Sequence, residues 1–152
     1  MFEDENILIS VRPRHVDSIV CGEKTVELRR RSLQLSPGCR VWIYTTLPRG
    51  AIEATAIVRT VVSDRPSVIW RKYGHLSGIT KSEFYEYYNG VNVAYAIVFS
   101  SVEKLIVSLA LAEIRQHLGQ FHPPQFFKRL APGSAELNLF TSVTALPQEF
   151  HM

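Results

Sequence analysis

The residues whose types and spacing are best suited to chemistry are Lys24, Glu27 and Arg29, which lie in the segment GEKTVELR. If this segment is a strand, Glu27 and Arg29 project from the same face and can pair or hold a ligand between them. A carboxylate accepts from the amino edge of a base, and an arginine contacts phosphate or a base acceptor. Lys24 could contact phosphate or, if desolvated, act as a nucleophilic amine. The alternative is a surface ion pair that contributes little.

Positive charge is concentrated around this segment. The chain carries a net charge of +3, with a sequence pI near 9.0. Residues 10–49 hold eight basic and three acidic side chains. The basic ones are Arg12, Arg14, Lys24, Arg29, Arg30, Arg31, Arg40 and Arg49. Seven of the eight are arginines, whose planar fork of donors suits phosphate and base edges, although an ordinary arginine-rich surface would look the same.

Short strands and inserted helices must position these residues. Period-two or β-branched patterns predict strands at residues 7–11, 24–31, 40–46, 51–62 and 92–101. Helices are expected from Pro13 to the Gly22 cap, from an Asp64 N-cap, from the Thr80–Glu83 capping box, and over 108–117. Because few helices lie between strands, a doubly wound parallel sheet is excluded. The order predicts a mixed α/β (α+β) fold, a small β-barrel decorated by helices.

The segment at residues 22–29 also fits the pattern Gly-x-Lys-x-x-Glu-x-Arg. This pattern resembles the signature of the ASCH domain (activating signal cointegrator homology), a member of the PUA-like superfamily. The resemblance continues in VWIYT at 41–45, in the strand at 92–99 and in PPQF at 123–126, and it covers residues 6–130. It implies a PUA-like barrel with a helix-lined cleft that binds RNA or a modified nucleotide or nucleoside. Lys24, Glu27 and Arg29 fall on the polar positions of the motif and would line that cleft.

The resemblance leaves two enzymatic alternatives open. One branch of the superfamily comprises amidohydrolases that remove the acetyl group of N4-acetylcytidine. Their motif has a threonine where this chain has Glu27, and Ser77 or His75 stands where they have a catalytic glutamate. A Lys24/Glu27 pair could still perform general acid–base chemistry as a catalytic pair. Another member type is a metal-assisted ribonuclease. Because no His/Asp/Glu cluster has ligand spacing, we expect neither a metal nor a cofactor.

Two further residues complete the predicted ligand site. Tyr44, in the strand at 40–46, is the aromatic residue nearest the cleft in the family pattern and could stack on a base. Arg12 lies between the first strand and the first helix, where it could reach phosphate. The predicted binding residues are therefore Lys24, Glu27, Arg29, Tyr44 and Arg12.

The length of 152 residues fits one globular domain. We assign residues 1–130 to the ASCH-like domain and 131–152 to a tail or an extension of it. The apolar stretch 137–150 could instead dock a protein partner, as in a transcription-related interaction module. No apolar run approaches the ~18–20 residues of a membrane span. The acidic start MFEDE and the lack of a disulfide framework for Cys21 and Cys39 favour a cytoplasmic protein.

Overall fold

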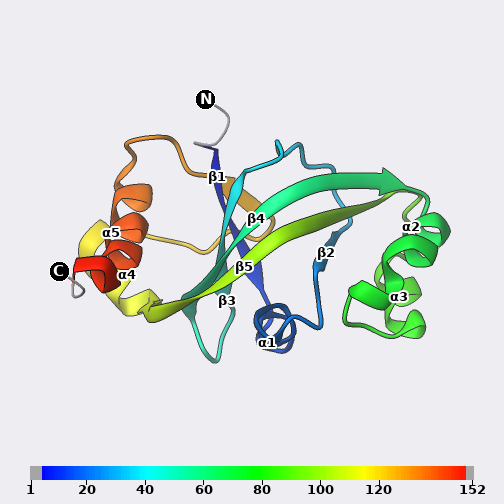
Figure 1. Cartoon of the computed structure of the whole chain (residues 1–152), viewed down its shortest axis with the longest axis horizontal. Helices are drawn as coiled ribbons and strands as arrows, with labels where there is room; N and C mark the ends of the chain where they lie inside the picture. The colour runs from blue at the N-terminus through cyan, green and yellow to red at the C-terminus, as the bar shows by residue number, and fades with distance from the viewer. Residues whose placement is uncertain (1–4, 150–152) are drawn as a thin grey trace.

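The computed structural model describes residues 5–149 and has five α-helices around one six-stranded sheet (Figure 1). The strands run in the order β2-β5-β4-β3-β1-β6, with β1 and β3 parallel and all other neighbours antiparallel. Their bounds are β1 Asn6–Val11, β2 Val26–Arg29, β3 Arg40–Thr45, β4 Ala51–Asp64, β5 Ala94–Ala110 and β6 Phe127–Arg129. The helices are α1 Pro13–Cys21, α2 Pro66–Tyr73, α3 Lys81–Tyr87, α4 Leu111–Leu118 and α5 Ala135–Glu149, with a 3₁₀ turn η2 at Gly74–Leu76.

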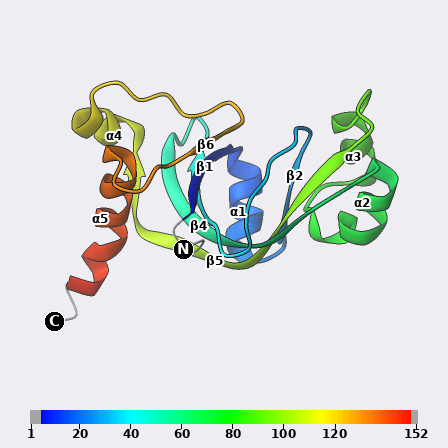
Figure 2. The ribbon, with the colours of Figure 1, turned by 90° about the horizontal axis from the view of Figure 1, so that it is seen from above.

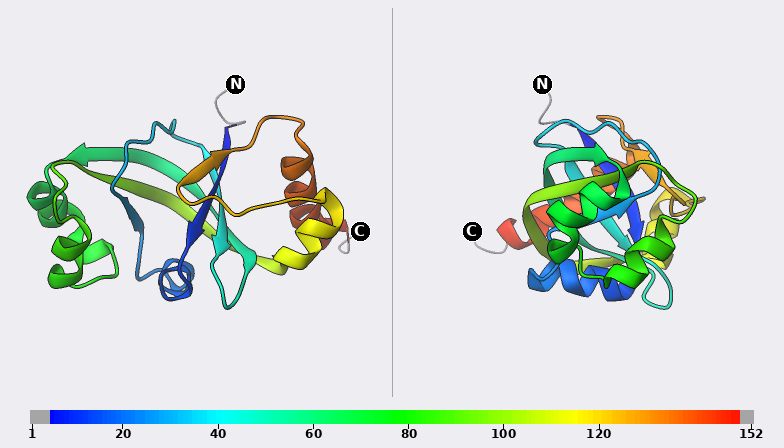
Figure 3. Two further views of the ribbon diagram at one scale, coloured as in Figure 1. Left: turned by 180° about the vertical axis from the view of Figure 1, so that it is seen from behind. Right: turned by 90° about the vertical axis from the view of Figure 1, so that its right-hand side faces the viewer.

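The predicted mixed α/β class is confirmed, but the sheet is a half-barrel and not a closed barrel. It curls strongly when viewed along the long axis of the molecule (Figure 3). Its edges are β2 and β6, which have only four and three residues. Among the described strands no ladder joins these two edges. The half-barrel is therefore open between β2 and β6, and we call this opening the seam. Contacts across the seam are made by side chains.

The long β4–β5 hairpin organises the rest of the chain. Figures 1 and 2 show α2 and α3 at one end of it, α4 and α5 at the other, and α1 between them. Strand β5 runs for 17 residues, to Ala110, so the helix expected from residue 108 begins only at Leu111. The prediction was wrong there because Leu109 pairs with Ile52 of β4 and is buried. A long-range ladder overrides the local helical pattern at this point.

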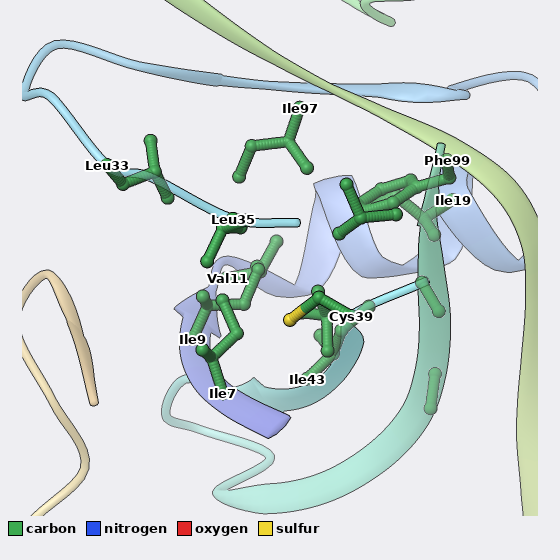
Figure 4. Packing of buried hydrophobic residues seen from close by; sticks show 14 of the residues in the cluster. Ile7, Ile9, Val11, Ile19, Leu33, Leu35, Cys39, Ile43, Ile97 and Phe99 are labelled. Atoms are coloured by element: carbon green, nitrogen blue, oxygen red, sulfur yellow. The ribbon is translucent and has the colours of Figure 1, made fainter. Parts of the chain in front are cut away.

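Three clusters of buried hydrophobic residues form the core. The first fills the concave side of the sheet and includes Ile7 and Ile9 of β1 and, on the α1 side, Ile19 (Figure 4). The second lies under α4 and α5, and there Phe140 packs against Trp42 with ring centroids 5.6 Å apart. The third lies beneath α2 and α3 and includes Phe84, Ile69 and Val26. Each end of the long hairpin is thus held by its own helical cluster.

The region after Leu130, expected to be a tail or an extension, contains the helix α5. Its Phe140 is 1% exposed, so this part of the proposed docking stretch is occupied within the fold. Phe150, at the end of that stretch, lies outside the described residues. Among the described helices, none has the length and apolar character to cross a membrane.

The residues predicted to mark helix ends do so in α1 and α3. Helix α1 has Pro13 at its first turn and ends at Gly22, whose φ of 89° needs a glycine. Helix α3 starts with the predicted capping box: the Glu83 amide donates to Thr80 Oγ1 (3.2 Å) and the Thr80 amide to Glu83 Oε1 (2.9 Å). Helix α2 differs, because its N-cap is Arg65 and not Asp64, whose carboxylate accepts from the Arg65 amide instead.

Candidate functional site

The structure places a cavity of about 550 Å³ beside β2, enclosed by the end of β1, helices α1 and α3, and the segment before β6. We call it the Lys24 cavity. It contains four of the five predicted ligand residues: Lys24, Glu27, Arg29 and Arg12. Its volume lies within the range of ordinary small-molecule sites.

Lys24 is a buried cation at the base of this cavity, with 2% of its surface exposed. Its Nζ donates to the backbone oxygen of Ser77 at 2.6 Å and lies 3.5 Å from Glu27 Oε1. Burial lowers the pKa of Lys24, and the neighbouring Glu27 carboxylate opposes that shift. An amine in this state can give up a proton more readily than an exposed lysine.

Glu27 lies between two cations. Its Oε2 accepts from Arg29 Nη2 at 2.9 Å, and its Oε1 faces Lys24. Burial alone would raise the pKa of Glu27, but Arg29, Lys24 and His15 together outweigh burial and lower it. The strand alternation predicted from the sequence thus holds, since Glu27 and Arg29 share the cavity face of β2.

Arg29 also closes the seam of the half-barrel. Its Nη2 donates to the Ser10 carbonyl in β1 at 3.1 Å, and its Nη1 donates to the Phe126 carbonyl just before β6 at 3.2 Å. Its Nε is buried and has no hydrogen-bond partner within the described residues. Arg29 is therefore a structural bridge as well as a wall of the cavity, and its removal would disturb both.

The cavity includes residues that sequence reasoning did not nominate. His15 lines it from α1, and its buried Nδ1 has no hydrogen-bond partner in the described part of the chain. Burial, and secondarily Lys24, lowers the pKa of His15, so its ring is neutral at neutral pH. The signal that was overlooked is its position one helical turn after Arg12.

The rim carries a salt bridge between Arg14 Nη2 and Glu83 Oε2, 2.8 Å apart. Glu83 was recognised only as part of the α3 capping box, but its second oxygen faces Arg14. Tyr87 and Gln125 complete this side. No local sequence pattern marks either residue as part of a site. Tyr87 reaches the cavity through the packing of α3, and Gln125 through the packing of the segment before β6.

Tyr44 is the predicted ligand residue that the structure places elsewhere. It is 3% exposed in the cluster beneath α4 and α5, and it does not line the Lys24 cavity. Strand β3 is central in the sheet and is covered on both faces, so alternation alone could not say which of its aromatic residues a ligand can reach.

Ser77 meets Lys24 through its backbone oxygen, while its hydroxyl donates to the Gly74 carbonyl. Among residues 5–149, no group of three His, Cys, Asp or Glu residues could hold a metal ion.

Comparison with known proteins agrees with the fold. A variant of the ASCH protein from Zymomonas mobilis, solved by crystallography, superposes with a TM-score of 0.84 and is 26% identical. The match covers 93% of this chain and 97% of that one. A family model described as "Domain of unknown function (DUF365)" matches residues 7–130. The chain belongs to this DUF365 family and is an ASCH domain.

Two curated relatives add sequence similarity to the structural match. A Zymomonas mobilis protein named "ASCH domain-containing ribonuclease" is 29% identical over 118 residues, covering 78% of this chain and 79% of that protein. A large ribosomal subunit protein uL22 from Ureaplasma parvum is 28% identical over 100 residues, which make up 66% of this chain but 32% of the ribosomal protein. The expected ASCH assignment and PUA-like fold are thus confirmed.

Proposed function

We propose that this ASCH domain binds RNA, with one nucleotide of the strand seated in the Lys24 cavity. The observation that carries the proposal is the buried Lys24–Glu27–Arg29 network, which lines the same cavity as two exposed arginines, Arg12 and Arg14. A relative that aligns over 78% of the chain is named a ribonuclease, which favours RNA as the ligand.

Each part of the cavity has a role in this proposal. Arg12 and Arg14 at the rim supply phosphate contacts, which provide affinity and salt dependence. The Glu27 carboxylate, held ionised by its neighbours, accepts from the amino group of a base. The same groups could bind a free modified nucleoside. Binding of such a nucleoside is therefore measured as one outcome of the test.

Fluorescence anisotropy with labelled single-stranded RNA and tRNA tests binding at several salt concentrations. The informative variant is Arg12→Ala/Arg14→Ala, because both side chains are exposed and their loss should leave the fold intact. The matched control is Arg59→Ala/Arg71→Ala, which removes two exposed arginines that do not line the cavity.

Losing two phosphate contacts should reduce the slope of log K against log salt by roughly 1.4, at about 0.7 per contact. The control variant should keep the slope of the wild type. Wild-type binding that ignores salt, or an equal loss in both variants, would exclude RNA binding at this site. Binding of a modified nucleoside without binding of RNA would point to the nucleoside as the ligand.

A specific observation favours RNA cleavage as a second function. His15 has an Nδ1 without a hydrogen-bond partner among residues 5–149 and a lowered pKa, and it lines the same cavity as the buried Lys24 ammonium. In the proposed step His15 accepts the proton of a ribose 2′-hydroxyl, and the 2′-oxygen forms a bond to phosphorus. The bond from phosphorus to the 5′-oxygen breaks, and Lys24 donates a proton to that oxygen. The products are a 2′,3′-cyclic phosphate and a 5′-hydroxyl.

Cleavage is tested with a short RNA and the same RNA carrying a 2′-O-methyl group at every residue. The wild type should cut only the first, and His15→Gln and Lys24→Met should each lower the rate by at least about a hundredfold. Turnover that survives in both variants would remove His15 and Lys24 from the reaction. Acylated nucleosides are incubated in parallel, because deacylation there would favour the amidohydrolase alternative.

A further inference from the structure

A second cavity, of about 690 Å³, borders the Lys24 cavity along the seam between β2 and β6. Arg29, Tyr87 and Gln125 line both cavities, so the two are adjacent. Its other walls are the residues that follow β2 and the residues at the start of β6, including Arg31 and Phe126. We call it the Arg31–Phe126 pocket.

Cationic and aromatic side chains meet in this pocket. The guanidinium carbon of Arg31 lies 3.9 Å from the ring centroid of Phe126, and that of Arg30 lies 6.0 Å from the ring centroid of Tyr87. Phe126 is still 43% exposed and Tyr87 is 41% exposed. Both arginines are exposed, and within the described chain their guanidinium groups form no ion pair or hydrogen bond.

The walls of the pocket are held in place by hydrogen bonds to backbone carbonyls, and these bonds do not involve the aromatic ring faces or the guanidinium groups of Arg30 and Arg31. Arg29 holds the Phe126 carbonyl, and Ser10 Oγ donates to the Pro124 carbonyl at 2.7 Å. The Tyr87 hydroxyl donates to the backbone of Leu28 at 3.3 Å, which fixes its ring beside β2. Pre-positioned rings lower the ordering cost of binding. Arg30 and Arg31 have no ion pair within the described residues that binding would have to break.

We propose that the Arg31–Phe126 pocket binds the nucleotide adjacent to the one in the Lys24 cavity, so that the ligand is single-stranded RNA of at least two nucleotides. The inference rests on the proposed RNA binding and specifies the form of the RNA. A base stacks on the exposed surface of Phe126, and Arg30 and Arg31 contact the phosphates on either side of it. Double-stranded RNA cannot use this site, because its bases are already stacked and paired.

The test measures binding of a ten-nucleotide adenosine strand, a matched RNA duplex and polyglutamate to the full chain. The variants are Phe126→Ala and Arg31→Ala, and the controls are Tyr85→Ala and Arg59→Ala. Tyr85 is an equally exposed aromatic residue, and Arg59 an exposed cation, and neither lines the two cavities. A strand carrying 2-aminopurine at successive positions reports stacking by loss of its fluorescence.

Each variant should weaken binding of the single strand about tenfold, and the controls should stay within twofold of the wild type. Quenching of one 2-aminopurine position should disappear in Phe126→Ala and persist in Arg31→Ala at saturating protein. If Phe126→Ala melts early, Arg31→Ala decides the outcome, because its side chain is exposed. Equal affinity for duplex, strong competition by polyglutamate, or variants that match the controls would overturn the inference. If the wild type binds no RNA at all, the proposed function fails with it.

Discussion

Removing the charge of Glu27 should destabilise the protein strongly, because this carboxylate neutralises two cations that are held out of water. The Lys24 and Arg29 side chains are only 3% and 16% exposed. Breaking a buried ion pair at one partner costs ~3–5 kcal/mol. Glu27→Gln should fall near the lower end, about 3 kcal/mol, since Lys24 keeps its bond to the Ser77 carbonyl and Arg29 keeps two backbone acceptors.

Urea unfolding followed by circular dichroism measures this loss. With a slope of about 2 kcal/mol per M, the midpoint should fall by roughly 1.5 M with the slope unchanged. The matched control is Glu83→Gln, the same substitution at an exposed salt bridge, where glutamine preserves the capping box. Its midpoint should stay close to that of the wild type.

Two further measurements separate the ion network from simple packing. The double variant Lys24→Met/Glu27→Leu removes the Glu27 carboxylate together with the more deeply buried of its two cations, leaving only Arg29, and should be more stable than Glu27→Gln by at least about 1 kcal/mol. Because the folded-state pKa of Glu27 is lowered, its contribution is present above the unfolded value of 4.5. The gap between wild type and Glu27→Gln should therefore narrow below pH 4.5 and close as the pH falls through the folded pKa. A loss under about 1 kcal/mol, or a double variant no better than the single, would refute the reasoning.

Three other predictions concern packing and thiol chemistry. Phe140→Ala should cost ~3–5 kcal/mol in urea unfolding, because the ring is 1% exposed; an unchanged midpoint would mean that α5 does not support the core. Gly78→Ala should cost ~1–2 kcal/mol, since φ is +74° and a new Cβ would lie 3.2 Å from that of Lys24; equal stability would contradict this packing. Iodoacetamide at pH 8 should modify the exposed Cys21 but modify Cys39 only after unfolding, because burial raises the pKa of Cys39 to about 12. Mass spectrometry counts the modified thiols, and rapid double labelling of the folded protein would contradict the buried site.

The sequence was sufficient for features that depend on neighbouring residues. Proline and glycine mark the two ends of α1, and the Thr80 capping box marks the start of α3. Strand alternation placed Glu27 and Arg29 on one face. These features depend on backbone sterics and on spacing within a few residues, so they can be predicted without knowledge of any tertiary contact.

Features set by distant segments were harder to predict. The helix expected from residue 108 starts at Leu111 because the chain up to Ala110 pairs with β4 as part of β5. Tyr44 was placed in the site, but a central strand buries it beneath α4 and α5. His15 was passed over because the histidines of the chain show no metal or triad spacing, and its approach to β2 and α3 in the cavity depends on the packing of distant segments.

The sequence by itself indicated the ASCH assignment and placed Glu27 and Arg29 on one face of a strand, because the motif and the strand period are local. Only the tertiary structure decided that the sheet stays open and that the motif lies beside the resulting seam. The physical reason is that, among the described strands, β2 pairs with β5 and β6 pairs with β1 but not with each other, and Arg29 of β2 instead donates to the backbone carbonyls of residues 10 and 126. Arg29 thereby lies between the two cavities and lines both of them, and this placement is not visible in the order of residues along the chain.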